Sequence, residues 1–301
     1  MPLPRRFMPF AACLIATGLT PVSAAFGQGL PTAAENLTPG DLDTEHLFGF
    51  TEGSDLGIPG EPELEWETTG RLGRRPGTFG AVDSGLALKV PLSNDFRLAP
   101  GVAFNAYEVG PPGGQTRTVG GLSAGFLETR LRLQDRREAP FGLTLNIVSS
   151  VGRIDTGSGL RASSYGTEAG LLADRELIPG KLVGAINLGY ALAATRLHRL
   201  DDRLLSSGLE VSGALAYQVQ PGTFLGGELR YLRAYDGLGL DRFTGEAVFL
   251  GPTLYASLSA QLWLSVAWSV QVAGRAAGEG GGLDLTNFDR HQARLRIGYN
   301  F

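Results

Sequence analysis

Hydrophobic and polar residues alternate with a period of two in two segments that lie far apart in the chain. In the first, Glu63–Leu72, uncharged residues alternate with a set that carries Glu63, Glu65, Glu67 and Arg71. In the second, residues 293–301, Arg294 and Arg296 alternate with apolar residues. Successive side chains of a strand point to opposite faces, so both segments read as strands with all charges on one face. A helix would scatter the same charges all round.

Ten further segments show a similar pattern, and each is about 9–13 residues long, the length that a tilted strand needs to cross a bilayer. We therefore expect twelve strands in all. Their apolar faces run over 86–92, 96–104, 127–133, 141–151, 165–173, 182–190, 209–219, 225–231, 249–258 and 262–272, of which 165–173 is weaker and 249–258 tolerates either parity.

The connections between these segments sort into two alternating kinds. Short turns are expected at 93–95, 134–140, 178–180, 220–222 and 259–261. Longer loops rich in Gly and charge are expected at 110–118, 153–164, 193–207, 235–246 and 274–291, whereas the first outer connection, 73–77, is short. An even number of strands with short periplasmic turns and longer outer loops is typical of an all-β, antiparallel, up-and-down outer-membrane barrel.

Aromatic residues gather at the expected strand ends, as the two interfacial girdles of a membrane barrel would require. One set is Phe96, Phe141, Tyr217, Tyr255, Tyr299 and Phe301, and the other is Phe104, Tyr165, Tyr190, Tyr231 and Phe249. A soluble β-sandwich also alternates, but it needs neither segments of such uniform length nor alternating loop lengths. The pattern favours the barrel.

The start of the chain predicts export. Arg5 and Arg6 precede an apolar stretch over 7–22 and small residues at 23–25, so residues 1–25 are expected to be a signal peptide for Sec-type export. Residues 26–60 show no sustained period and precede the barrel, 61–301. This segment either lies in the periplasm as a tether or folds into the lumen as a plug, with Leu47, Phe48 and Phe50 packing against the wall.

Three motifs resemble known proteins. The terminal LRIGYNF, with Tyr299 and Phe301, resembles the C-terminal signature that the barrel-insertion machinery reads in bacterial outer-membrane proteins. LFGFTEGSDLG at 47–57, followed by Gly60-Glu61, and FLGPTLY at 249–255 resemble a group of proteobacterial outer-membrane proteins. These are similar to a transporter family linked to the meta-pathway of phenol degradation. The resemblance implies location in the outer membrane of a Gram-negative bacterium and passage of small, even hydrophobic, molecules. It supplies no catalytic residues.

Composition narrows the function further. The 301 residues are 43% hydrophobic and 19% charged, with 44 Gly and a formal net charge of −4, which excludes a disordered chain and gives no basic surface for nucleic acid. The only cysteine, Cys13, lies in the expected signal peptide. The mature chain would therefore have no disulfide, no thiol nucleophile and no cysteine metal site. We expect no cofactor and no metal.

The polar face of the strands is expected to line the lumen and to form the pathway of any solute. Its acids and bases balance, seven against seven, which favours a structural network of ion pairs and gives little reason to expect strong ion selectivity. Glu63, Glu65 and Glu67 would face Arg294 and Arg296 across the closing seam. The expected lumen residues are Glu63, Glu65, Glu67, Arg71, Lys89, Glu128, Arg130, Arg132, Glu168, Asn187, Glu210, Glu228, Arg230, Arg294 and Arg296, with Asn146 and Gln271 between them.

We expect a channel or transporter for small molecules, passive or substrate-gated, in contact with outer-membrane lipid and lipopolysaccharide. The alternative is a non-conducting anchor whose outer loops, 193–207 above all, bind a partner. Catalysis is not expected. The mature histidines are His46, His198 and His291, and no nucleophile stands at a recognisable motif spacing from them.

Overall fold

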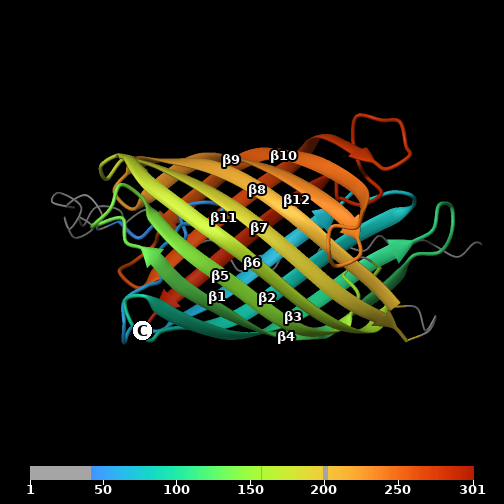
Figure 1. Ribbon diagram of the computed structural model, residues 1–301, viewed down its shortest axis with the longest axis horizontal. Helices are drawn as coiled ribbons and strands as arrows, with labels where there is room; N and C mark the ends of the chain where they lie inside the picture. Colours follow the sequence, from blue (N-terminus) through green and yellow to red (C-terminus); the bar gives the residue numbers. More distant parts are fainter. Residues whose placement is uncertain (1–41, 157, 199–202) are drawn as a thin grey trace, which may run out of the picture. The chain divides into compact units, whose positions relative to one another are not determined.

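The computed structural model describes residues 42–156, 158–198 and 203–301. Twelve antiparallel strands form a closed barrel in which each strand pairs with its neighbours in sequence and β1 pairs with β12 (Figure 1). The all-β, twelve-stranded prediction is therefore confirmed. The strands are β1 (Glu63–Leu72), β2 (Thr78–Pro91), β3 (Phe96–Gly110), β4 (Arg117–Gln134), β5 (Gly142–Ile154), β6 (Arg161–Ile178), β7 (Leu182–Leu197), β8 (Arg203–Gln220), β9 (Thr223–Asp236), β10 (Arg242–Ser257), β11 (Leu262–Ala276) and β12 (His291–Asn300).

The outer face of the barrel wall is apolar and its inner face is polar, the reverse of a soluble β-sandwich. Large apolar side chains stand on the outside, where Ile186 is 65% exposed and Leu215 is 52% exposed. Arg97, Arg130 and Arg296, by contrast, are buried inside. An apolar exterior around a polar interior is the pattern of a membrane barrel. Among the described residues, no helix is long and apolar enough to cross a membrane.

The two ends of the barrel differ in their connections. At one end, called the turn end, β1 begins, β12 ends and short turns join β2–β3, β4–β5, β6–β7, β8–β9 and β10–β11. At the other, called the loop end, the connection between β11 and β12 spans residues 277–290.

Most strands are longer than predicted, and most outer loops are correspondingly shorter, whereas β1 has the predicted bounds, Glu63–Leu72. Strands β4, β6 and β8 each have 18 residues. The expected loop 193–207 is mostly strand, because β7 and β8 stay paired from Leu182↔Tyr217 to Arg196↔Arg203. Such pairing satisfies the backbone polar groups beyond the length that a bilayer requires. The rest of that loop, 199–202, and the expected signal peptide, 1–25, lie outside the described residues.

Two predicted girdle residues were placed on the wrong face. Phe249 is fully buried and points inward, with the Arg230 guanidinium 5.3 Å from its ring centroid. Tyr255 also lies inside, stacked 6.2 Å from Trp263. The register shift opposite Val248 and Phe249 leaves Val272 of β11 as the extra residue, so β10 itself keeps its alternation here. The parity of β10 was ambiguous because apolar residues stand on both of its faces, with Phe249 inside and Leu250 outside. Other girdle residues, such as Tyr165 and Tyr217, are exposed on the outside.

Candidate functional site

A loop that precedes β1 lies inside the barrel. It comprises Thr44–Asp55 and is called the inner loop. Its two ends meet, because the Thr44 backbone N–H donates to the Asp55 carboxylate at 2.8 Å. Its middle is deeply buried, with Leu47 1% exposed and Phe48 fully buried. A compact loop with closed ends that is packed by its own side chains is an Ω-loop.

The neck of the inner loop is fixed to the wall near the turn end. Asp174 on β6 accepts hydrogen bonds from the Thr44 hydroxyl at 2.6 Å and from the Ser54 backbone N–H at 2.5 Å. Arg136, in the β4–β5 turn, forms an ion pair with Asp55 at 2.6 Å, and Arg132 lies 3.8 Å from the same carboxyl group. Burial is the largest influence on Asp55. Burial, together with Asp43 and Asp174, outweighs Arg136 and raises the pKa of Asp55 to about 6.

Glu45 joins the inner loop to three cations of the wall. Its carboxylate lies 2.8 Å from Lys89 Nζ, 2.5 Å from the Arg97 guanidinium and 3.3 Å from the Arg130 guanidinium. Glu45 is 2% exposed. Burial opposes its ionisation, but Arg97, Lys89, His46 and Arg130 together hold its pKa well below the ordinary value. The inner loop thus places a buried negative charge among three cations of the wall.

His46 lies beside this cluster, stacked 3.8 Å from Trp263 on β11. Its ring nitrogens are 3.2 Å from Glu63 and 3.6 Å from Glu65. Among the described residues, His46, Glu63 and Glu65 are the one group whose donor atoms could surround a metal ion. The Lys89 ammonium already lies 3.0 Å from Glu63 and 2.8 Å from Glu65. Lysine therefore supplies the positive charge that these carboxylates need.

The apolar tip of the inner loop packs against a patch of small residues on the wall. Leu47 and Phe48 form one buried cluster with Val183, Ala185, Ala214, Ala216 and Phe224. The three alanines give room for the larger side chains of the loop. Burial of such side chains contributes about 1.5–3 kcal/mol each.

Backbone groups of the inner loop are bonded to polar side chains on the same strands of the wall. Glu228 on β9 accepts from the Phe50 N–H at 2.7 Å and from the Thr51 N–H at 3.0 Å. Asn187 on β7 exchanges two hydrogen bonds with the backbone of Glu52, at 2.7 and 2.9 Å. These bonds satisfy the buried backbone of a segment that has no secondary structure of its own.

Two residues explain the close fit of the tip. A Cβ at Gly49 would lie 2.4 Å from the Ala267 Cβ on β11, so only glycine fits there. The ring of Phe50 lies between two guanidinium groups, with its centroid 3.8 Å from Arg230 and 4.2 Å from Arg294. Both distances are within the range of cation–π attraction.

The inner loop divides the lumen. A cavity of about 350 Å³ is lined by Glu52, Glu67 and Arg296 among others, and a second, of about 320 Å³ and nearer the turn end, is lined by Asp43, His46 and Arg136 among others. Glu45 and Lys89 line both. The inner loop and its ion pairs therefore stand between the two cavities.

The β11–β12 loop, residues 277–290, also reaches into the lumen. Gln271 on β11, fully buried, donates to the backbone oxygens of Asp284 at 2.9 Å and Asp289 at 3.2 Å. The Asp289 carboxylate lies 3.3 Å from Arg74 and 3.7 Å from Arg71. This loop narrows the barrel near the loop end.

Most of the polar residues expected in the lumen contact the inner loop. The structure brings it together with Glu63, Glu65, Lys89, Arg130, Arg132, Asn187, Glu228, Arg230, Arg294 and Arg296. The rest lie elsewhere on the wall. Glu67 pairs with Arg294 at 3.4 Å, Arg71 with Asp83 at 2.6 Å, Glu128 with Arg97 at 2.5 Å and Glu210 with Arg230 at 3.8 Å, whereas Glu168 is exposed and has no recorded partner among the described residues.

Two finer expectations concern the seam and the C-terminus. The register of the seam places Arg296 directly opposite Glu67, so acid and base face each other there as expected. The Arg296 guanidinium also donates to the Phe48 carbonyl at 3.0 Å and lies 3.9 Å from Glu52 of the inner loop. Tyr299 and Phe301 are 41% and 62% exposed at the turn end, and their role in insertion remains a prediction.

Several contacting residues escaped the sequence analysis, notably Glu45, His46 and Glu52 of the inner loop and Arg97, Arg136 and Asp174 of the wall and turns. Arg97 follows the strand alternation between Phe96 and Leu98, so its inward position was readable. The acids of the loop carry no such period. Only the accumulation of acidic residues before the first strand could have suggested that they pair with the arginines of the lumen.

The remaining histidines are not part of this site. His198 Nε2 lies 2.9 Å from the Ser163 hydroxyl on an exposed part of the wall, and no carboxylate is recorded beside the pair among the described residues. His291 stacks 5.8 Å from Trp268.

The fold is similar to that of known outer-membrane proteins. The crystal structure of the COG4313 outer membrane channel from Pseudomonas putida F1 matches with a TM-score of 0.59 at 14% identity, covering 88% of this chain and 100% of that one. The NanC porin structure matches with a TM-score of 0.48 at 9% identity, covering 79% of this chain and 100% of that one. No curated protein matches the chain. None of these findings links it to phenol degradation. Residues 41–301 match a family described as one of unknown function, and the chain belongs to this family, DUF6662.

Proposed function

We propose that this protein is an outer-membrane channel for small molecules that is closed by its inner loop and opens when that loop leaves the lumen. The observation that carries the proposal is the buried inner loop, which is held inside a twelve-stranded barrel by charges and hydrogen bonds. Barrels of this size lie between the filled eight-stranded and the open sixteen-stranded kinds. A single loop is therefore enough to block the lumen.

In this proposal the turn end faces the periplasm and the loop end faces outward, as in other outer-membrane barrels. The inner loop then enters from the periplasmic side. Positive-φ glycines, Gly57 and Gly60, follow it before β1 begins. These positions favour glycine for conformational reasons and lie where a hinge would be needed.

The contacts that hold the inner loop suit a reversible gate. Ion pairs, cation–π contacts and hydrogen bonds to side chains can all be replaced by water when the loop departs. The apolar contribution of Leu47 and Phe48 favours the closed state. The proposed pathway is lined by the lumen residues of both charge signs, so we propose small polar solutes and weak ion selectivity.

Planar-bilayer recording tests this function. The refolded protein is compared with a variant that lacks residues 28–60, and heat-modifiable gel migration confirms that both barrels are folded. We expect rare openings in the full chain and steady conductance in the variant. Silence in both folded proteins would contradict the channel, whereas equal steady conductance in both would contradict closure by the inner loop.

A further inference from the structure

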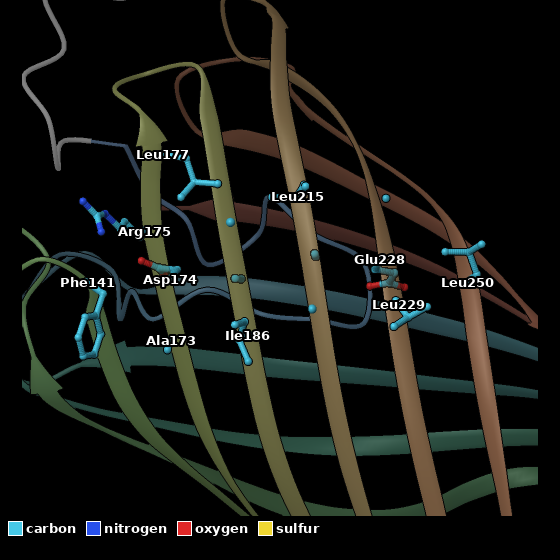
Figure 2. Close-up of a pocket in the computed structure, with 15 residues that line it drawn as sticks. Phe141, Ala173, Asp174, Arg175, Leu177, Ile186, Leu215, Glu228, Leu229 and Leu250 are labelled. Carbon is cyan, nitrogen blue, oxygen red and sulfur yellow. The ribbon is translucent and has the colours of Figure 1, made fainter.

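A groove of about 650 Å³ runs across the outer face of β6 to β10 (Figure 2). Its walls are outward-facing apolar side chains, among them Leu177, Ile186, Leu215, Leu229 and Leu250. The hollow exists because glycine occupies outward positions on three successive strands, Gly184 on β7, Gly213 on β8 and Gly227 on β9. Its volume falls within the range of about 300–1,000 Å³ that is usual for small-molecule pockets.

The groove does not open into the lumen. Its strands stay paired beneath it, with Gly184 opposite Leu215 and Gly213 opposite Leu229. On the inner side of the same wall, Ala185 and Ala214 pack against Leu47 and Phe48 of the inner loop. The occupant must therefore come from the surroundings of the barrel.

One end of the groove is positively charged. Arg175 on β6 lines it and is exposed on the outer face, three residues before the strand ends at the turn end. No hydrogen bond or ion pair of Arg175 is recorded within the described part of the chain. A guanidinium group at the edge of an apolar groove complements an amphiphile with an anionic head and an apolar tail.

We propose that this groove binds an anionic phospholipid, with one acyl chain lying over the three glycines and the phosphate against Arg175. The inference rests on the proposed placement of the barrel in a membrane, where the turn end meets the phospholipid leaflet. The acyl chain would make dispersion contacts with the wall at the glycines, which have no side chains to make them. The nearby glycines make this face differ from the leucine-rich surface around it.

Native mass spectrometry of the detergent-purified full chain tests the site, with phosphatidylglycerol and phosphatidylcholine of identical acyl chains as probes. We expect a retained phosphatidylglycerol adduct. Gly213→Leu fills the groove and should reduce the adduct on the order of ten-fold. A Cβ at position 213 has its nearest neighbour 3.8 Å away, so the first atom of the new side chain meets no clash. Gly125→Leu is the matched control, because Gly125 is an outward glycine on β4 whose nearest neighbour is 4.0 Å away.

Arg175→Gln tests the headgroup separately. It should weaken phosphatidylglycerol about five-fold, the effect of one basic residue near an anionic lipid, and leave phosphatidylcholine unchanged. Arg153→Gln, at an exposed outward position on β5, is its control. The proposal would be overturned if all variants retained phosphatidylglycerol equally, or if the protein retained lipopolysaccharide alone. A dimer that Gly213→Leu dissociates would also overturn it, since the groove would then be an interface. A folded barrel that retains the lipid but never conducts would contradict only the proposed channel.

Discussion

Replacing Glu45 by Gln should open the channel. The substitution keeps the shape of the side chain but removes the negative charge that faces Lys89, Arg97 and Arg130 at 2.5–3.3 Å. Removing one partner of a buried ion pair typically costs about 3–5 kcal/mol, because the other partner stays buried without compensation. This cost falls on the closed state, since water reaches the same cations once the inner loop has left.

The remaining acids limit the effect to the lower end of that range. Lys89 keeps Glu63 and Glu65, and both arginines keep Glu128. We therefore expect about 3 kcal/mol, which is roughly a hundred-fold shift of the closed–open equilibrium at about 1.4 kcal/mol per factor of ten. Glu138→Gln, an exposed acid in the β4–β5 turn, is the control and should change nothing.

Single-channel open probability measures this shift directly. Hydrogen exchange provides a second readout, because the backbone N–H groups of Phe50 and Thr51 are protected by Glu228 only while the inner loop is seated. The open probability and the exchange rate of these two N–H groups should both rise in the Glu45→Gln protein. If open probability and exchange both match the wild type, the ion pairs of Glu45 do not hold the gate.

Three further changes test other contacts of the inner loop. Phe50→Ala removes two cation–π contacts of about 0.5–2 kcal/mol each and should raise open probability by about five-fold or more, whereas an unchanged value would contradict the role of the Arg230–Phe50–Arg294 stack. Gly49→Ala places a Cβ 2.4 Å from the Ala267 Cβ and should also favour opening, with partial rescue by Ala267→Gly; absence of rescue would point to a different clash. The pKa of Asp55 is raised from 3.8 to about 6, so this group stabilises the seated loop below pH 4 and loses that contribution as the pH rises through 6. Open probability should accordingly increase between pH 4 and pH 7, and Asp55→Asn should flatten this increase; an equally steep profile in the variant would assign it to another group.

The fold could be predicted from the sequence because the membrane imposes one rule on every strand. Lipid requires apolar side chains outside, so a period of two marks each crossing, as at Glu63–Leu72. The rule failed at β10, where apolar residues stand on both faces, with Phe249 inside and Leu250 outside. The rule also predicted most strands to be too short, because pairing beyond the bilayer depends on the neighbouring strand and not on hydrophobicity.

The same rule predicts only part of the site. The lumen face of the wall followed from alternation, so residues such as Lys89 and Arg130 could be named. The conformation of Thr44–Asp55 could not, because an irregular loop takes its shape from partners that are distant in sequence. Glu45 and Lys89 illustrate this, since their contact depends on the closed barrel. The sequence therefore does not decide whether residues 26–60 form a plug or a tether.

The most direct test of closure by the inner loop is a reversible lock between the loop and the wall. A Cβ at position 142 on β5 lies 3.1 Å from the Ser54 Cβ, close enough for a disulfide after a shift of a few tenths of an ångström. Ser54→Cys and Gly142→Cys are combined with Cys13→Ser, and single-channel current is recorded before and after reduction. The account predicts silence when the disulfide is intact and openings once it is reduced. Equal conductance in the two states would contradict it.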